Sequence, residues 1–272
     1  MKGIALGQYY PADSLIHKLD PRIKIVIAIL YIVCSFLCKN VLSFSLLILS
    51  AVLLILLGKI PLKIITRGLR PILVILIFTS VINIFWTTGE TLLFEWRFIT
   101  IYLEGIFSAI FIMIRIVSLI IGTSMLLTYT TTPIELTDGI EDLLYPLKKL
   151  GVPVHDFAMM MTIALRFIPT LVEETDKIMT AQKARGADFS SGSLVNRAKA
   201  LIPILIPLFV SAFNRAADLA TAMECRCYHG GDGRTRMKVR HIRFADVIPL
   251  FVIVGFGVSL IVLNKLGIGF TM

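Results

Sequence analysis

The sequence predicts an all-α integral membrane protein with about five transmembrane helices and a helical cytoplasmic domain. Of its 272 residues, 57% are hydrophobic and 17% are charged, whereas soluble domains carry about 25% charged residues. The apolar residues gather in long runs, which indicates helices that cross a bilayer. The net charge of +9 lies beside these runs, and cytoplasmic loops of membrane proteins are rich in Lys and Arg. We therefore expect a lipid bilayer, and no nucleic acid, as a partner.

Five apolar runs are the candidate membrane spans. A spanning helix needs about 20 residues, with roughly 17 as a lower limit, so the first run is short and needs residues from its flanks. The runs divide the chain into a membrane domain with four spans (residues 1–128), a cytoplasmic domain (129–245) and a C-terminal transmembrane helix (246–272). The five runs are Ile23–Leu37, Val41–Leu57, Leu69–Trp86, Ile106–Leu127 and Val247–Leu263.

Charges between the runs predict the orientation. The segment between the second and third runs carries Lys59, Lys63, Arg67 and Arg70 and no acid, whereas the next segment carries three glutamates and one arginine. By the positive-inside rule, the first segment is cytoplasmic and the second lies outside. The N-terminus and the domain at 129–245 then lie in the cytoplasm. Because the number of spans is odd, the C-terminus lies outside.

The cytoplasmic domain is predicted to consist of helices of different character. Thr132-Pro133 begins a helix over Ile134–Leu150, since proline suits the first turn, and Gly151-Val152-Pro153 ends it. Phe157–Ile168 is apolar but interrupted by an arginine, so we expect an amphipathic helix along the membrane surface that Pro169 closes. Two longer helices follow: a polar one at Glu173–Ala187, and one at Leu194–Tyr228 that two internal prolines kink.

The last two helices end on similar sequences. Ala181-Gln182-Lys183-Ala184-Arg185-Gly186 and Ala222-Met223-Glu224-Cys225-Arg226-Cys227 each place an alanine one turn before an arginine with small neighbours. A guanidinium is a planar fork of donors that matches a carboxylate at two points, so Arg185 and Arg226 suit an acidic groove on another protein. One arginine near a helix C-terminus is usually an ordinary surface charge. The repetition favours contacts with a two-fold symmetric partner.

The two motifs differ in the residues that flank the arginine. Gly186 takes a positive φ at little steric cost and closes its helix. Cys227 stands at the equivalent place with a Cβ that resists this conformation, so we expect the second helix to continue toward Gly230. Cys225, Cys227 and His229 also form a Cys-x-Cys-x-His pattern, whose residue types can bind a metal ion. A closed zinc site needs four ligands, however, and no second Cys/His pair lies near in the sequence.

Other features leave alternatives open. Arg115 lies inside the fourth run, where it either faces a partner group or wet cavity, or snorkels or pairs with Glu104. His155-Asp156, with the Cys225–His229 string, would be the centre of a membrane enzyme, although Asp156 as a helix cap is the simpler interpretation. A secondary transporter is a third class, which the lack of broken spans with polar midpoints disfavours. The chain has no G-x-x-x-x-G-K-[ST], which excludes a P-loop.

Two stretches of the chain carry motifs of a known family. The first comprises Gly7-Gln8-Tyr9, Asp13-Ser14, His17, Leu19-Asp20-Pro21-Arg22 and Lys24; the second comprises Leu147, Leu150-Gly151-Val152-Pro153, Arg166-Phe167-Ile168-Pro169-Thr170 and Ala181–Gly186. In this order they resemble the transmembrane component of energy-coupling factor (ECF) transporters, the EcfT family. The resemblance covers nearly the whole chain.

The resemblance implies a four-part complex in the bacterial plasma membrane. This subunit would join two ABC-type ATPases, which bind ATP and Mg, to a small membrane protein that binds a vitamin or a metal ion. Residues 129–245 would be the coupling domain with two long coupling helices, and the chain would have no catalytic, cofactor-binding or metal-binding residue. Ala184-Arg185-Gly186 matches the family's ATPase-docking motif, and Cys225-Arg226-Cys227 keeps only its arginine. This difference leads us to expect two different ATPases.

Overall fold

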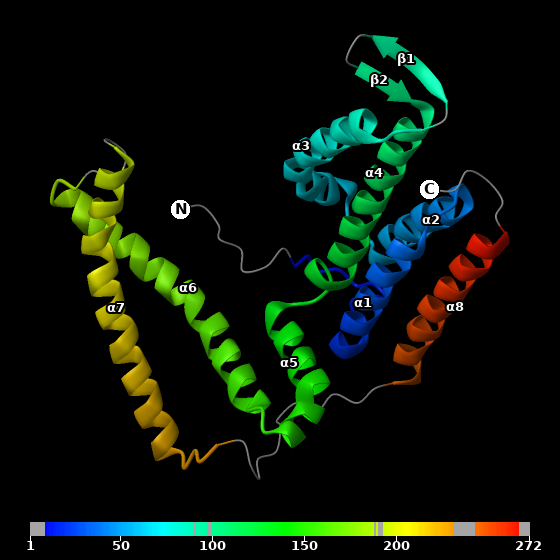
Figure 1. The fold of residues 1–272 in the computed structure, drawn as a ribbon. Helices are drawn as coiled ribbons and strands as arrows, with labels where there is room; N and C mark the ends of the chain where they lie inside the picture. The colour runs from blue at the N-terminus through cyan, green and yellow to red at the C-terminus, as the bar shows by residue number, and fades with distance from the viewer. Residues whose placement is uncertain are drawn as a thin grey trace. The chain divides into compact units, whose positions relative to one another are not determined.

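The computed structural model describes residues 9–89, 91–96, 99–187, 189, 193–230 and 243–266 (Figure 1). Gly7, Gln8 and parts of the loops between helices therefore lie outside the described residues. The chain forms two compact units. The described part of the first, the bundle unit, holds residues 9–140 and 243–266, and that of the second, the hairpin unit, holds residues 141–230. The predicted domain boundaries at 128 and 245 remain a prediction.

The helices confirm an all-α membrane protein, with one short β-hairpin that the sequence did not indicate. The hairpin pairs β1 and β2 antiparallel between the third and fourth helices. In chain order the elements are α1 (Pro21–Leu37), α2 (Val41–Gly58), α3 (Leu62–Trp86), β1 (Leu92–Trp96), β2 (Ile99–Tyr102), α4 (Leu103–Thr123), the π-helical turn η1 (Ser124–Thr128), α5 (Pro133–Leu144), the 3-10 helix η2 (Tyr145–Leu150), α6 (Val154–Ala184), α7 (Leu194–Cys225) and α8 (Phe244–Leu266).

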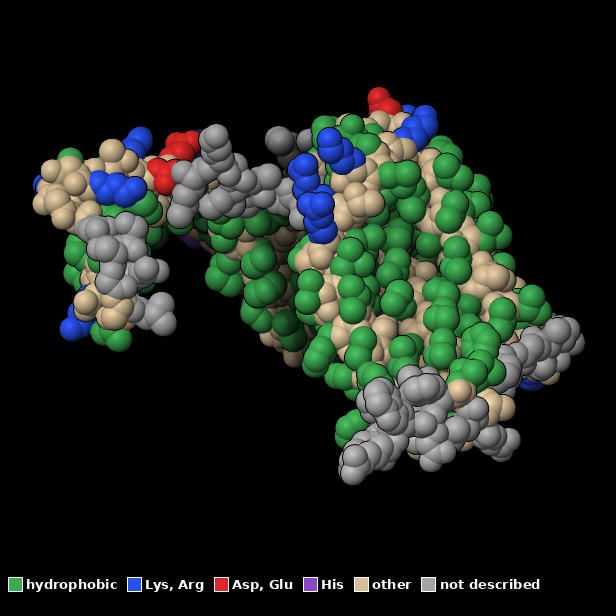
Figure 2. Space-filling view, turned by 90° about the horizontal axis from the view of Figure 1, so that it is seen from above, with side chains coloured by type: hydrophobic (Ala, Val, Ile, Leu, Met, Phe, Trp, Pro, Cys, Tyr) green, Lys and Arg blue, Asp and Glu red, His purple; other side chains and the backbone are tan. Residues whose placement is uncertain are grey.

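Five helices of the described chain are long and apolar enough to cross a membrane. They comprise α2, α3, α4 with η1, most of α7, and α8. The number agrees with the prediction but the set differs: the 17-residue α1 is not among these five helices, whereas α7, which was expected in the cytoplasm, is. Apolar side chains cover most of the described surface in the view of Figure 2, and charged side chains are few. This surface is typical of a protein that faces lipid.

The core of the bundle unit is built around α4, which packs against α1, α2 and α3, while α8 packs against α1 and α2. Phe44 on α2 stacks on Phe111 of α4 with ring centroids 4.7 Å apart. Gly122 lets the backbone of α4 approach the buried ring of Tyr31 on α1, since a Cβ there would overlap that ring. Small residues commonly permit such close approach between transmembrane helices.

At the α1–α2 turn, polar side chains donate hydrogen bonds to backbone carbonyls at the helix ends, and Arg115 contacts the same turn. Asn264 of α8 donates to the Leu37 carbonyl at 2.6 Å, and Asn40 donates to the Leu263 carbonyl at 3.2 Å. The two asparagines thus satisfy terminal carbonyls of neighbouring helices. Arg115 donates to the carbonyl of the turn residue Cys38 at 2.8 Å, and its guanidinium lies 5.3 Å from the centroid of the Phe44 ring. These contacts give Arg115 a structural role in holding the turn.

Lys24 joins α1 to the segment that follows η1. Its side chain is fully buried, and the ammonium donates to the Thr130 carbonyl at 2.8 Å and to the Thr131 hydroxyl at 3.2 Å. A buried charge is tolerated where hydrogen-bond acceptors surround it. The next helix, α5, begins with a reciprocal capping box, because the side chains of Thr132 and Glu135 each accept the other's backbone N–H. The predicted start of this helix at Thr132-Pro133 is confirmed.

In the hairpin unit, a single helix, α6, spans residues where the sequence predicted two helices, Phe157–Ile168 and Glu173–Ala187. Pro169 does not close a helix but lies inside α6, which runs from Val154 to Ala184. An interior proline costs about 3 kcal/mol, but Phe167 and Leu171 on either side of it line a groove shared with α7. Packing of an apolar face can outweigh a local helix preference, which explains the error. Asp156 lies in the first turn of α6 and is not its cap.

Candidate functional site

Both long helices of the hairpin unit end on an arginine. Arg185 is the C-cap of α6, and Arg226 is the C-cap of α7. Small neighbours flank each arginine, so each helix end offers a planar fork of donors to another molecule. The residues that the sequence singled out are all exposed at these two ends: Ala184, Arg185, Gly186, Cys225, Arg226 and Cys227.

The hydrogen bonds that close the two helices are equivalent. At the end of α6, the N–H groups of Gly186 and Ala187 donate at 3.0 Å to the carbonyls three and five residues earlier. At the end of α7, the N–H groups of Cys227 and Tyr228 donate in the same way at 2.8 and 3.0 Å. This pair of bonds defines the Schellman motif, in which the residue after the C-cap is left-handed. The two arginines therefore leave their helices from the same backbone geometry.

The prediction that α7 would continue toward Gly230 is wrong. The helix ends at Cys225, and Cys227 adopts a φ of 55°. This is a left-handed conformation, like that of Gly186 with a φ of 86°. A left-handed conformation costs a residue with a Cβ about 1–2 kcal/mol. The hydrogen bonds from Cys227 and Tyr228 offset part of this cost by satisfying terminal carbonyls. The second motif therefore closes its helix as the first one does.

The two arginines lie at opposite ends of an antiparallel helix pair. Gln182, near the end of α6, donates to the carbonyl of Pro203 on α7 at 3.4 Å. Arg226 follows Pro203 by 23 residues on the same helix, which is about 35 Å at 1.5 Å per residue. The two guanidinium groups are therefore too far apart to bind one carboxylate. They are spaced for two separate contacts.

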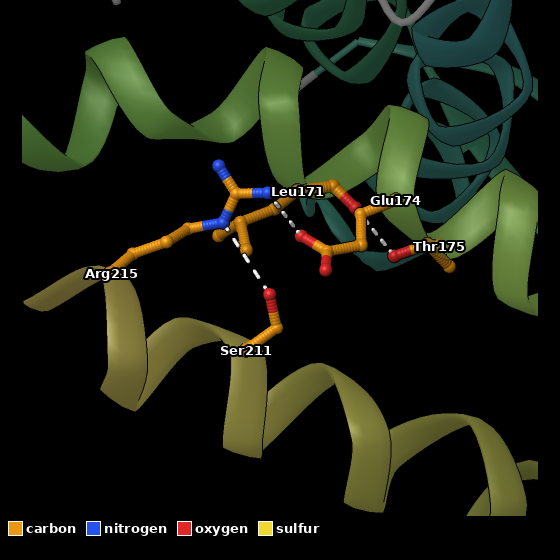
Figure 3. Close-up of polar contacts among 5 residues, drawn as sticks. All are labelled: Leu171, Glu174, Thr175, Ser211 and Arg215. Carbon is orange, nitrogen blue, oxygen red and sulfur yellow. Dashed lines mark hydrogen bonds and ion pairs between the residues drawn. The ribbon is translucent and has the colours of Figure 1, made fainter.

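A polar contact that sequence reasoning missed joins the middle of the two helices. The guanidinium of Arg215 on α7 donates to the Glu174 carboxylate on α6 at 2.9 Å and to the Ser211 hydroxyl at 3.4 Å (Figure 3). The Ser211 hydroxyl and the Arg215 guanidinium lower the pKa of the Glu174 carboxyl below its usual range. Next to this pair, α6 and α7 share an apolar groove of about 240 Å³.

One face of α7 exposes a continuous row of apolar side chains. Its members recur at intervals of three and four residues or stand next to one another, as on one side of a helix. A contiguous exposed apolar surface indicates contact with lipid or with another protein. The row, here called the α7 apolar face, consists of Leu201, Ile202, Leu205, Ile206, Phe209, Val210 and Phe213.

The residues of the enzyme alternative do not form one cluster. His155 contacts Glu141 at 3.0 Å, whereas Asp156 is exposed. Within the described ranges, which include Cys225, Cys227 and His229, no three His, Cys, Asp or Glu side chains lie where they could hold a metal ion. An enzyme needs its titratable groups gathered in a pocket. The partner of His155 is instead Glu141, which is not one of the residues that the enzyme alternative requires.

Comparisons with known proteins identify the family. The family model described as CbiQ, cobalt transport protein, matches residues 12–238. A protein of Clostridium kluyveri named energy-coupling factor transporter transmembrane protein EcfT is 55% identical over 249 residues, which cover 91% of this chain and 92% of that protein. The proteins of the same name from Bacillus subtilis and Lactococcus lactis are 50% and 45% identical, over 88% and 97% of this chain and 89% and 99% of their own lengths. The chain belongs to the EcfT family of transmembrane subunits of energy-coupling factor transporters.

Proposed function

We propose that this chain is the coupling subunit of an ECF-type ABC importer, which joins two ABC-type ATPases to a small substrate-binding membrane subunit for uptake of a vitamin or a metal ion. The observation that carries the proposal is the matched pair of arginine ends. Arg185 and Arg226 leave α6 and α7 from the same Schellman geometry, about 35 Å apart at opposite ends of the pair. Two helix ends with the same backbone geometry suit two corresponding acidic grooves, one on each ATPase of a dimer with approximate two-fold symmetry.

In the proposed mechanism, motion of the ATPases is transmitted to α6 and α7 through these two helix ends. ATP and Mg bind to the ATPases, and this chain supplies no catalytic, cofactor-binding or metal-binding residue. Closure of the ATPase dimer moves the docked Arg185 and Arg226, and with them α6 and α7. Truncating one partner of a buried charge pair costs about 2–5 kcal/mol, so loss of either arginine weakens docking by about 30-fold or more. The flanking residues differ between the two ends, and we propose that the two ATPases differ as well.

The α7 apolar face is proposed as the docking surface for the substrate-binding subunit. Its side chains are exposed along a helix that is apolar enough to lie in a membrane. A membrane-embedded partner is the class of protein that covers such a surface without exposing it to water. Tilting of α7 would then tilt or release the partner. The proposed orientation places the N-terminus and the coupling domain with its two arginine ends on the cytoplasmic side, and the C-terminus outside.

The test is a pull-down of the tagged chain from its native membrane in mild detergent. The wild type is compared with the Arg185→Glu/Arg226→Glu variant and with a control, Lys177→Glu/Lys199→Glu. The control makes the same change of charge at exposed positions within the same two helices. We expect ATPase subunits with the wild type and the control, and none with the arginine variant.

A further variant separates the two proposed surfaces. Phe209→Ser/Phe213→Ser changes the α7 apolar face and leaves both arginine ends intact. We expect it to recover the ATPases but to lose the small membrane subunit. If the wild type recovers no ATPase, the coupling mechanism fails, and the chain should then be assayed as an enzyme. If the arginine variant still recovers both ATPases, Arg185 and Arg226 are not the docking groups.

A further inference from the structure

Glu174 and Arg215 occupy equivalent places on α6 and α7. Glu174 lies eleven residues before Arg185, and Arg215 lies eleven residues before Arg226. Eleven residues are close to three full turns, or about 17 Å of helix. The ion pair is therefore equally far from the two arginine ends. On each helix it lies on nearly the same side as the terminal arginine, since three turns return to the same face.

Other residues repeat with the same offset of 41 positions. Ser211, which contacts Arg215, corresponds to Thr170 on α6. An antiparallel pair with matched positions has an approximate two-fold axis, and that axis passes where equivalent positions contact each other. Glu174 and Arg215 are such a pair. Further matches are Ile163 with Ile204, Thr180 with Thr221, and Ala181 with Ala222.

The contacts beside the ion pair are of a kind that permits sliding. The groove beside it is lined by apolar residues of both helices: Ala212, Ala216, Leu219, Ala220 and Met223 of α7, and Ile163, Phe167 and Leu171 of α6. Apolar contacts are non-directional, and the three alanines among them offer few ridges to fix a register. The Arg215–Glu174 bond at 2.9 Å is directional and charge-assisted. The contact of Gln182 with Pro203 is long, at 3.4 Å.

We infer that Glu174 and Arg215 form the pivot of the coupling hairpin: a positioning pair that fixes α6 against α7 at the midpoint between the two docking arginines. The inference rests on the proposed function. With the pivot in place, each arm is about 17 Å long, so movement at one ATPase is transmitted to the other end with equal amplitude. Without it, the helices shift along the apolar groove, and the spacing of Arg185 and Arg226 is no longer defined.

The experiment measures the spacing of the two arms in the purified complex by pulsed EPR. Spin labels are placed at the matched exposed positions through Thr180→Cys and Thr221→Cys, in a chain whose exposed Cys225 and Cys227 are replaced by serine. Distances are recorded without nucleotide and with ATP and vanadate. All distance comparisons stay within this labelled background, and recovery of the ATPases is measured in the same samples and in the unlabelled wild-type chain.

Three variants test the pivot. We expect Glu174→Gln to lose the single narrow distance peak and the shift between the two nucleotide states, while the ATPases are still recovered. The charge exchange Glu174→Arg/Arg215→Glu should restore both. Glu173→Gln, at the exposed neighbouring position, should match the parent chain. Together with retained ATPase binding, this pattern supports a pivot rather than a general loss of folding.

Two results would overturn the inference. One is a Glu174→Gln complex with the same narrow peak and the same nucleotide shift as its parent. The other is a charge exchange that restores neither, because a pivot made by this ion pair is indifferent to which helix carries which charge. Failure of the unlabelled wild-type chain to recover ATPases refutes the proposed function instead, so the two failures are distinguishable.

Discussion

Replacement of Cys227 by glycine should stabilise the end of α7. Cys227 holds φ at 55°, a conformation that costs a residue with a Cβ about 1–2 kcal/mol. Glycine removes this cost but adds about 0.4–1 kcal/mol of conformational entropy to the frayed state. The expected net gain is about 1 kcal/mol, which is a factor of about five in the equilibrium between the closed and the frayed helix end.

Amide hydrogen exchange measures this gain directly. The N–H groups of residue 227 and Tyr228 donate to carbonyls of the last turn, and they exchange only when that turn opens. We expect Cys227→Gly to slow their exchange about fivefold. Gly186→Ala is the converse change, because its φ is 86° and a Cβ there meets nothing within 4 Å. It should speed exchange at the end of α6 by a similar factor through backbone strain alone.

Cys225→Ala is the matched control, since it removes a thiol from the last helical residue of α7 and leaves the left-handed position unchanged. It should leave exchange at Tyr228 close to that of the wild type. If Cys227→Gly leaves exchange unchanged or speeds it, the left-handed geometry at the end of α7 is wrong. Arg185 and Arg226 would then not leave equivalent helix ends.

Gly122→Ala should lower the apparent Tm of the detergent-purified chain, at about 1–3 kcal/mol for an overlap with the neighbouring tyrosine ring. Gly255→Ala, where a Cβ meets nothing within 4 Å, should leave the Tm unchanged or raise it; equal effects of the two would contradict the packing described. Lys24→Met should cost about 2–3 kcal/mol, because the buried Thr130 carbonyl loses a charged donor, and a thermal melt that matches the wild type would refute this. The lowered pKa of Glu174 means that this carboxylate contributes stability above the ordinary carboxyl pKa of 4.5 and loses it only as the pH falls below that value. The EPR distances should therefore stay constant from about pH 7 down to about pH 4.5, where an unperturbed carboxyl is already half protonated, and a change within that window would show that Glu174 is not held ionised by its partners.

The relation between sequence and structure differs from one element to the next. Hydrophobic runs determined α2, α3, α4 and α8, since a bilayer demands about 20 apolar residues wherever a helix crosses it. Proline and a capping threonine determined where α5 begins. The β-hairpin at Leu92–Trp96 and Ile99–Tyr102 was not predicted. A strand pair that short is stabilised by its surroundings and leaves only a weak signal in its own residues.

The sequence by itself determined the membrane class, the family motifs and the two arginines at helix ends, because hydrophobic length and local residue patterns carry that information. Only the tertiary structure decided that α6 continues through Pro169, that Cys227 accepts a left-handed φ, and that Glu174 meets Arg215. Each of these depends on what lies across from the residue or on hydrogen bonds that close a turn. Such interactions are decided by packing between segments far apart in the chain, and local propensity does not contain them.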